Sequence, residues 1–379
     1  MPFGLYLHFP FCRNKCAYCD FYKEIHDPRN EERFYAALRA ETELVFEAWP
    51  GEDYEVGTIY IGGGTPSLTS LPLLGDWLAV VRRLYSVPSE IEFSFETNPE
   101  SVSLELLQGL QELGVNRPVF GFQSFNQRLL KLLGRQHKLH DAHRAVYLAN
   151  ALGYDNYGGD LIYALPKQTA RMLSADLDQL VDLDPPHISL YELAVEPGTP
   201  LEAKVAGGKL KMPDDELRYA LGRAGYEYLT EAGYERYEVC SFARPGHECR
   251  HNMGYWQGND YLGLGPSAHS YLNGRRFANT RSLDDYIAKL SQGRRPVVVD
   301  ESGLEQRIIE TVMLGFRTSR GIDLKQFADR FGSDLKEHLS GEELARLIDT
   351  GHVIEEENSL RLSDDAMFLA DEITGRLVK

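Results

Sequence analysis

The chain contains 379 residues, of which 43% are hydrophobic, and its formal net charge is −17. This length suffices for one large and one small domain, and the hydrophobic fraction argues against an intrinsically disordered protein. The acidic balance argues against nucleic acid as the main partner, because a phosphate-binding surface needs an excess of Lys and Arg.

The first residues, MPFGLYLHFPFC, do not resemble a signal peptide, because they lack a basic segment and a long apolar run. Elsewhere no apolar run approaches the roughly 18 residues of a membrane span. We therefore expect a cytoplasmic protein without a membrane span, in which cysteine thiols stay reduced. The five cysteines are an odd number with three of them clustered, so they do not suggest a disulfide framework.

Short β-rich segments alternate with helical segments along the first half of the chain. The expected strands are residues 4–9, 56–61, 91–96, 117–122, 157–165 and 187–193. Between the first strands, residues 30–49 repeat apolar side chains at helical spacing, and residues 103–113 begin with a Ser suited to cap a helix. Strands alternating with helices predict a parallel sheet of the α/β class. Six such units predict a partial (β/α)6 TIM-like barrel rather than a closed eightfold one.

A second segment follows, and we place the first domain at residues 1–285 and the second at 303–379. Residues 304–317 and two further stretches have helical patterns, and a hairpin with Glu357, Asn358 and Ser359 near its turn precedes a last helix. This order predicts a winged-helix-like domain. Residues 300–379 carry 10 Lys and Arg against 18 Asp and Glu, so packing or protein contact is favoured over DNA binding.

Polar and cysteine residues follow the expected strands at their carboxyl ends, where chemistry gathers in a parallel barrel. Cys12, Cys16 and Cys19 come after the first strand with the spacing C-x3-C-x2-C, and a GGGTP stretch (residues 62–66) comes after the second. Three thiols within eight residues on a loop indicate a metal or cluster site. A structural zinc site requires four protein ligands, so three thiolates leave one coordination position of the metal for another ligand.

The other candidates at these strand ends also have ordinary structural explanations. Three glycines after a strand most often mark a tight turn, although they also let a ligand approach the backbone. Glu96 is equally explained as a solvated acid, Gln123 as a surface amide and Asp160 as an ion-pair partner.

The cysteine spacing, with Tyr18 before the last cysteine, resembles the radical S-adenosylmethionine superfamily. The resemblance implies that the three thiolates hold three irons of a 4Fe-4S cluster. The fourth iron is then left to the amino and carboxylate groups of S-adenosylmethionine, and reductive cleavage of the sulfonium gives a 5′-deoxyadenosyl radical. In such a protein the cofactor carries the difficult chemistry and the chain orients it.

The resemblance extends over nearly the whole chain and narrows to the branch that contains oxygen-independent coproporphyrinogen III oxidase and the HemW heme chaperones. The stretches LYLHFPFC, IGGGTPS, FETNPE, GFQSFN, LLGRQH, DLIYALPKQT and ELAVEPGTPL carry it in order. The resemblance implies an S-adenosylmethionine site made of Tyr6, Tyr18, Gly63, Gly64, Thr65, Glu96, Gln123, Arg135, Asp160 and Ala194. Ala164 and Lys167 replace glycines usual in this branch, and Pro118 replaces an aliphatic or small residue, which puts local loop geometry in doubt.

Two features of the oxidase and one of the chaperones distinguish the members of this branch. The oxidase carries a fourth cysteine two residues after the third, where this chain has Phe21, and a long arm before the first strand, where this chain has three residues. The stretch ECRHNMGYW contains H-N-x-x-Y-W, which resembles the motif linked to heme binding in the chaperones. His251 is therefore the candidate heme ligand, with a satisfied polar histidine beside aromatic residues as the structural alternative.

The sequence thus favours a heme chaperone that binds heme, a 4Fe-4S cluster and S-adenosylmethionine and transfers heme to an acceptor protein. The alternatives are oxidative decarboxylation of coproporphyrinogen III to protoporphyrinogen IX, and an acidic interaction protein with a degenerate barrel. We expect as partners a heme acceptor, which a membrane could carry, an electron donor for the cluster and a second copy in a homodimer. Whether S-adenosylmethionine is cleaved or only bound is left open, and coproporphyrinogen oxidase activity is not expected.

Overall fold

The computed structural model describes residues 2–48, 55–300 and 303–378 of the chain. Trp49, the last residue of the first expected helix, and Met1 and Lys379, at the outer limits of the two expected domains, lie outside the described residues. In the described part of the chain, no helix has both the length and the apolar character needed to cross a membrane.

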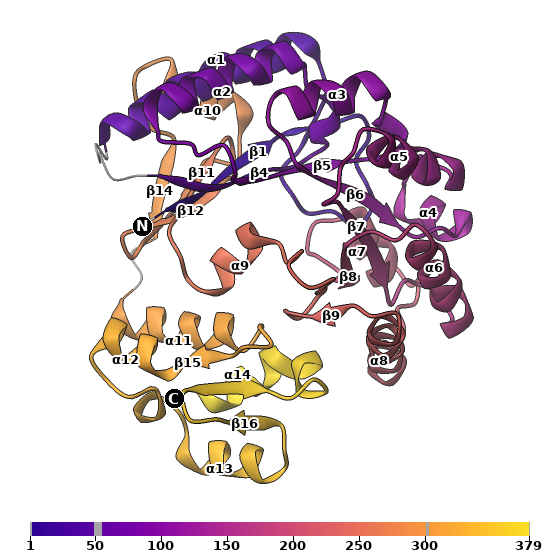
Figure 1. Ribbon diagram of the computed structural model, residues 1–379, viewed down its shortest axis with the longest axis vertical. Coiled ribbons are helices and arrows are strands. Elements are labelled where there is room, and N and C mark those ends of the chain that lie inside the picture. Colours follow the sequence, from indigo (N-terminus) through magenta and orange to yellow (C-terminus); the bar gives the residue numbers. More distant parts are fainter. Residues whose placement is uncertain (1, 49–54, 301–302, 379) are drawn as a thin grey trace.

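A parallel sheet of six strands forms the centre of the larger part of the molecule (Figure 1). Its strands, in spatial order, are β1 (Phe3–Phe9), β4 (Val56–Gly63), β5 (Glu92–Thr97), β6 (Arg117–Gln123), β7 (Gly158–Tyr163) and β8 (His187–Glu192). Each is parallel to its neighbours, and spatial order follows chain order. All six predicted strands are confirmed, with ends that differ by a few residues.

Helices connect these strands and cover the outer face of the sheet (Figure 1). They are α1 (Pro28–Ala48), α2 (Leu71–Leu84), α3 (Leu104–Glu112), α4 (Gln127–Leu133), α5 (Leu139–Ala151), α6 (Ala170–Asp182), α7 (Pro200–Ala206) and α8 (Asp215–Glu231). The predicted cap is confirmed, because the Ser103 side chain accepts a hydrogen bond from the Leu106 amide at the start of α3. Buried apolar side chains such as Leu38, Leu78 and Phe93 join helices and sheet in one core.

The sheet continues past both ends of the parallel set without closing. Next to β1 come β11 (Tyr261–Leu264), β12 (His269–Leu272), β13 (Arg275–Asn279) and β14 (Val297–Asp300), and next to β8 come β10 (Ser241–Ala243) and β9 (Glu235–Arg236). The fold is therefore the expected partial barrel. Since β14 belongs to this sheet, the larger part reaches residue 300, beyond the limit of 285 expected from the sequence.

Two further helices complete the larger part of the molecule. Helix α10 (Leu283–Leu290) packs on α1. Helix α9 (Arg250–Trp256) lies between the sheet and the C-terminal domain (Figure 1), where it contacts β4 and α11 (Leu304–Gly315). A short pair of strands, β2 (Phe11–Cys12) and β3 (Glu24–Ile25), frames the cysteine loop. Single-turn 3₁₀ helices occur at Pro66–Leu68, Pro99–Ser101, Leu335–His338 and Ala366–Leu369.

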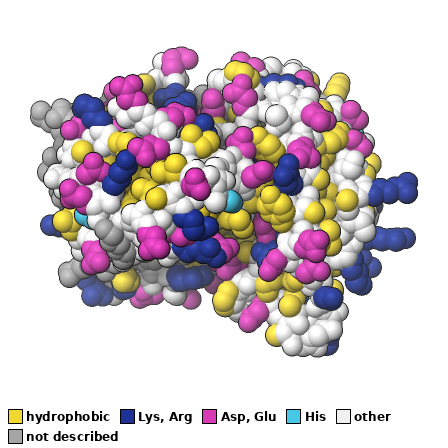
Figure 2. Space-filling view, turned by 90° about the horizontal axis from the view of Figure 1, so that it is seen from below, with side chains coloured by type: hydrophobic (Ala, Val, Ile, Leu, Met, Phe, Trp, Pro, Cys, Tyr) yellow, Lys and Arg dark blue, Asp and Glu magenta, His cyan; other side chains and the backbone are white. Residues whose placement is uncertain are grey.

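The C-terminal segment has its own hydrophobic core, which includes Val312, Phe327 and Leu360. Its elements are α11 (Leu304–Gly315), β15 (Ile322–Asp323), α12 (Leu324–Phe331), α13 (Gly341–Asp349), β16 (Val353–Glu355), β17 (Ser359–Leu362) and α14 (Ala370–Leu377). This order of helices with a β16–β17 hairpin is the expected winged-helix-like arrangement. On the face that this segment presents, acidic and basic side chains are interspersed (Figure 2), unlike the continuous basic surface that nucleic acid requires.

Candidate functional site

A cavity of about 410 Å³ lies at the carboxyl ends of the parallel strands. It brings together all but two of the residues expected from the sequence to bind cofactors or metal. Those that line it are Cys12, Cys16, Tyr18, Cys19, Gly63, Gly64, Thr65, Glu96, Gln123, Arg135, Asp160 and Ala194. Because parallel strands end at one rim of a barrel, loops far apart in sequence converge there.

The cysteine loop leaves β2 and passes over this rim. Its backbone is held in place by other segments: the Ala17 amide donates to the Leu133 carbonyl at 2.9 Å, and Lys23 Nζ donates to the Cys19 carbonyl at 2.6 Å. Cys12 is buried and accepts a hydrogen bond from Thr65 Oγ1 to its Sγ at 3.4 Å. None of the five cysteines is in a disulfide.

The donor set at this loop fits a polynuclear cluster better than a single metal ion. Among the described residues, no three His, Cys, Asp or Glu side chains are arranged to hold one ion between them. A 4Fe-4S cluster instead takes one thiolate for each iron, so its ligands need not converge on a point. Burial raises the pKa of Cys12 and of Cys19, so metal binding at these thiols must displace protons.

The glycine loop after β4 approaches the backbone of the cysteine segment closely. A Cβ on Gly64 would lie 2.5 Å from the Phe11 carbonyl oxygen, and Gly63 has a φ of 106°, which favours glycine. The amides of Gly63, Gly64 and Thr65 already donate to protein acceptors. The backbone of this loop therefore has carbonyl oxygens rather than amides to offer a ligand, and these suit an ammonium group.

Two half-buried carboxylates, Glu96 and Asp160, face the cavity from β5 and β7. Burial, together with the charge of Asp160, raises the pKa of Glu96 to about 7, although hydrogen bonds from Tyr60 and Gly63 lower it in part. Burial raises the pKa of Asp160 to about 6. Asp160 Oδ1 is buried without a hydrogen-bond partner among the described residues. An acid with one unpaired oxygen beside a second acid fits a cationic ligand, which would favour the charged form of both.

Arg135 provides a positive charge in the same cavity. Its Nη2 donates to Asn98 Oδ1 at 2.8 Å and to the Gly121 carbonyl at 2.7 Å, while its buried Nε has no partner in the described part of the chain. A guanidinium held in this way suits a ligand carboxylate. Asn98, which also donates to Thr65 Oγ1, was not identified from the sequence, although its place two residues after Glu96 was a usable signal.

The two departures from the family's glycines keep the glycine-like backbone. Ala164 has a φ of 58° and Lys167 a φ of 67°, both in the left-handed region that a side chain disfavours. Gln123, which lines the cavity, also has a positive φ, of 64°. The loop geometry that the substitutions put in doubt is thus retained, at a cost in backbone strain.

Tyr6 and His251 lie outside this cavity. The Tyr6 hydroxyl is 3.1 Å from His8 Nδ1. His251 is buried in α9 with both ring nitrogens engaged, Nδ1 at 2.7 Å from Thr58 Oγ1 and Nε2 at 2.7 Å from the Tyr255 hydroxyl. Burial lowers the pKa of His251 to about 3, so the ring is neutral.

Comparison with known proteins places these features in a family. The model of the radical SAM superfamily matches residues 6–180, and that of the HemN C-terminal domain matches residues 304–369. The chain is 32% identical over 372 residues to the heme chaperone HemW of Bacillus subtilis, covering 98% of this chain and 97% of that protein. The chain belongs to the HemW family of heme chaperones.

Other members of the HemW family are similarly close. The Mycobacterium tuberculosis HemW is 38% identical over 85% of this chain and 83% of its own length. Among solved structures, coproporphyrinogen III oxidase (HemN) from Escherichia coli has a TM-score of 0.85 and 23% identity, covering 99% of this chain and 89% of that one. That likeness confirms the fold, and the radical SAM match implies the 4Fe-4S cluster and S-adenosylmethionine as cofactors, which the donor set of the cavity fits.

Proposed function

We propose that this protein is a heme chaperone that binds heme and transfers it to an acceptor protein. The observation that carries this proposal is the match to a HemW heme chaperone over 98% of the chain. The proposal includes a role for the cluster and S-adenosylmethionine in controlling heme assembly or transfer, because the residues that would hold both are kept in one cavity.

Each group of residues at the cavity has a separate task in this proposal. Cys12, Cys16 and Cys19 hold the cluster, and the glycine loop with Glu96 and Asp160 receives the positive charges of S-adenosylmethionine. Arg135 and its partner Asn98 orient the ligand carboxylate. When bound, the cluster and S-adenosylmethionine supply one-electron chemistry, and the barrel excludes water around them.

His251 remains the sequence-derived candidate for the heme iron ligand. Its Nε2 is 2.7 Å from the Tyr255 hydroxyl, so ligation through this atom requires that hydrogen bond to break. Replacement of His251 by Ala is the test, because an unchanged heme spectrum and affinity would exclude this ligand.

The partners and location in this proposal follow from the cofactors. Besides the heme acceptor, which a membrane could carry, an electron donor must reach the cluster, and a homodimer is a further proposal. A cytoplasmic location suits free thiols and an oxygen-sensitive cluster.

One experiment tests the function directly. Cluster-reconstituted, anaerobic protein is titrated with ferric heme, and the same sample is assayed for conversion of coproporphyrinogen III beside a control oxidase. We expect a Soret band that saturates with heme and no conversion of coproporphyrinogen III. Conversion without heme binding would assign the oxidase function instead.

A further inference from the structure

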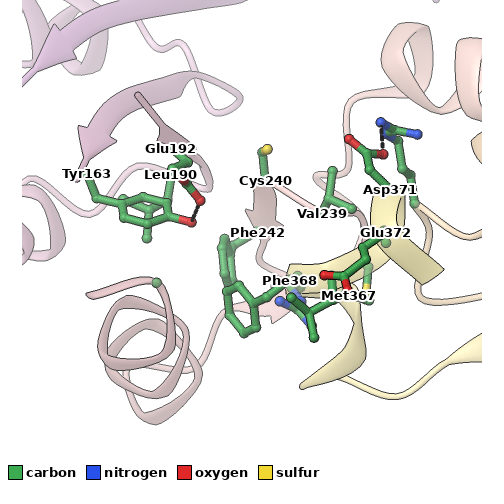
Figure 3. A pocket seen from close by; sticks show the side chains of 15 residues that line it. Tyr163, Leu190, Glu192, Val239, Cys240, Phe242, Met367, Phe368, Asp371 and Glu372 are labelled. Atoms are coloured by element: carbon green, nitrogen blue, oxygen red, sulfur yellow. Dashed lines mark hydrogen bonds and ion pairs between the residues drawn. The ribbon is translucent and has the colours of Figure 1, made fainter. Parts of the chain in front are cut away.

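A second cavity, of about 420 Å³, lies where the barrel meets the C-terminal domain. Figure 3 shows Tyr163, Leu190 and Glu192 on the barrel side of this cavity and Met367, Phe368 and Asp371 on the C-terminal side. The exposed residues Leu369, Asp371 and Glu372 form its mouth. Its volume falls within the range of small-molecule sites.

This junction cavity is next to the cluster cavity. Glu192 lines both, and its neighbours on β8 divide between them, since Leu190 lines the junction cavity and Tyr191 the cluster cavity. Alternation of side chains along a strand explains this division. A ligand in the junction cavity would therefore be separated from the S-adenosylmethionine site by a single strand.

The acidic residues of the junction cavity are already neutralised by cations. The pairs are Glu192 with Arg218, Asp371 with Arg317 and Glu372 with Arg376. Glu192 also accepts a hydrogen bond from the Tyr163 hydroxyl at 3.1 Å. These carboxylates therefore leave little net negative charge to repel an anionic ligand.

Arg236 is the buried cation of this cavity, with a side chain only 2% exposed. Its guanidinium lies over the rings of Tyr226 and Phe368, with centroid distances of 4.6 and 4.9 Å. Arg236 Nη2 donates to the Asp364 carbonyl, and the nearest carboxylate oxygen, of Asp364, is 3.7 Å away. Arg236 Nε is buried without a hydrogen-bond partner in the described residues. A buried guanidinium with a spare donor favours an anionic group of a ligand, such as a carboxylate.

Two sulfur side chains line the same cavity, Cys240 after β9 and Met367 before α14. In Figure 3, Cys240 lies between Glu192 and Val239, with the ring of Phe242 nearby. Thiolate and thioether are both ligand types of heme iron, and aromatic rings pack well on a porphyrin face. Heme contains each kind of group for which this cavity has a partner: an iron that accepts sulfur ligands, an apolar ring and carboxylates.

We propose that the junction cavity is a second heme position, in which Cys240 Sγ ligates the iron and Arg236 binds a propionate. This inference rests on the proposed heme chaperone function. On ligation a sulfur lone pair forms the S–Fe bond and the thiol proton leaves to solvent, with no change in the oxidation state of the iron. Heme held here is distinct from heme ligated by His251, because His251 lies in α9 and does not line this cavity.

The test is a ferric heme titration of the cluster-reconstituted full-length protein, followed by absorption and EPR. We expect the parent protein to give the signature of thiolate-ligated ferric heme. Cys240→Ser should lose this signature, and Arg236→Gln should keep it with an affinity lowered about tenfold. Cys249→Ser is the matched control, because Cys249 is fully buried outside this cavity.

Unfolding midpoints of all variants are measured beside the titrations, because Arg236 is buried. The conservative Cys240→Ser change keeps the size of the side chain, so it decides the proposal if Arg236→Gln proves unstable. The same spectrum and affinity in Cys240→Ser and in the parent would overturn the second position while the chaperone function stands. Absence of heme binding by the parent would instead overturn the chaperone function itself.

Discussion

Two polar regions inside the barrel differ in how well their groups are paired. In the cluster cavity, Asp160 Oδ1 and Arg135 Nε are buried without partners among the described residues. Around His251, both ring nitrogens are engaged and Glu92 accepts from the amides of Arg250 and His251. Unpaired buried groups cost stability unless a ligand completes them, so the first region fits a ligand as it stands, whereas His251 must give up a hydrogen bond before it can bind one.

The largest expected effect is on the cluster. Replacing Cys16 by Ala removes one of three thiolates, so anaerobic reconstitution should no longer give the EPR signal of an intact 4Fe-4S cluster. The matched control is Cys249→Ser, which alters a cysteine outside the cavity and should leave the signal unchanged. An intact signal in Cys16→Ala would show that the loop does not hold the cluster.

Substitutions around His251 should change the stability of the fold. His251→Ala removes a buried ring and leaves Thr58 and Tyr255 without partners, so we expect a loss of about 3 kcal/mol in the free energy of unfolding, measured in urea. Tyr255→Phe removes only one of these hydrogen bonds and should cost about 1 kcal/mol. Equal losses in the two variants would contradict the network described for His251.

Substitutions in the cluster cavity should change the affinity for the ligand instead. Asp160→Asn removes a negative charge that faces the cavity, and we expect the affinity for S-adenosylmethionine to fall about tenfold in equilibrium dialysis, with little loss of stability. The exposed Asp155→Asn carries the same charge change away from the cavity and serves as control. An affinity equal to that of the parent would remove Asp160 from the site.

The same carboxylates give the binding a pH dependence. Glu96 and Asp160, with pKa values raised to about 7 and about 6, are neutral below those values and charged above them. The sulfonium keeps its positive charge at every pH, so affinity should rise about fivefold between about pH 5 and about pH 7.5. In Glu96→Gln the upper part of this rise should disappear, and a flat profile in the parent would show that neither acid faces the ligand.

The smallest expected effect concerns backbone strain at the cavity rim. Lys167 is exposed and has a φ of 67°, so Lys167→Gly should raise the free energy of unfolding by about 0.5 kcal/mol. The same change at Lys131, an exposed residue in the last turn of α4, should lower it by up to about 1 kcal/mol. Thermal or urea unfolding of the two variants compares them directly, and destabilisation by both would contradict the strain at Lys167.

Local sequence patterns predicted much of the fold and of the site. Alternating apolar patterns and strand-end loops are local signals, so the six parallel strands, the capped helix at Ser103 and the cysteine loop followed from the sequence alone. The rule that parallel strands end at one rim then placed Glu96 and Asp160 near the cysteines. Asn98 was not identified from the sequence, because its role depends on the guanidinium of Arg135, 37 positions away.

By itself, the sequence determined the element order and the loop that carries the three thiols, since both depend on neighbouring residues. Only the tertiary structure decided which polar groups are paired: it engages both nitrogens of His251 and leaves Asp160 and Arg236 with spare capacity. It also created the cavity between barrel and C-terminal domain, whose walls come from residues 163–242 and 317–372 of the chain. Pairing and cavities depend on which distant segments meet, and no local pattern contains that information.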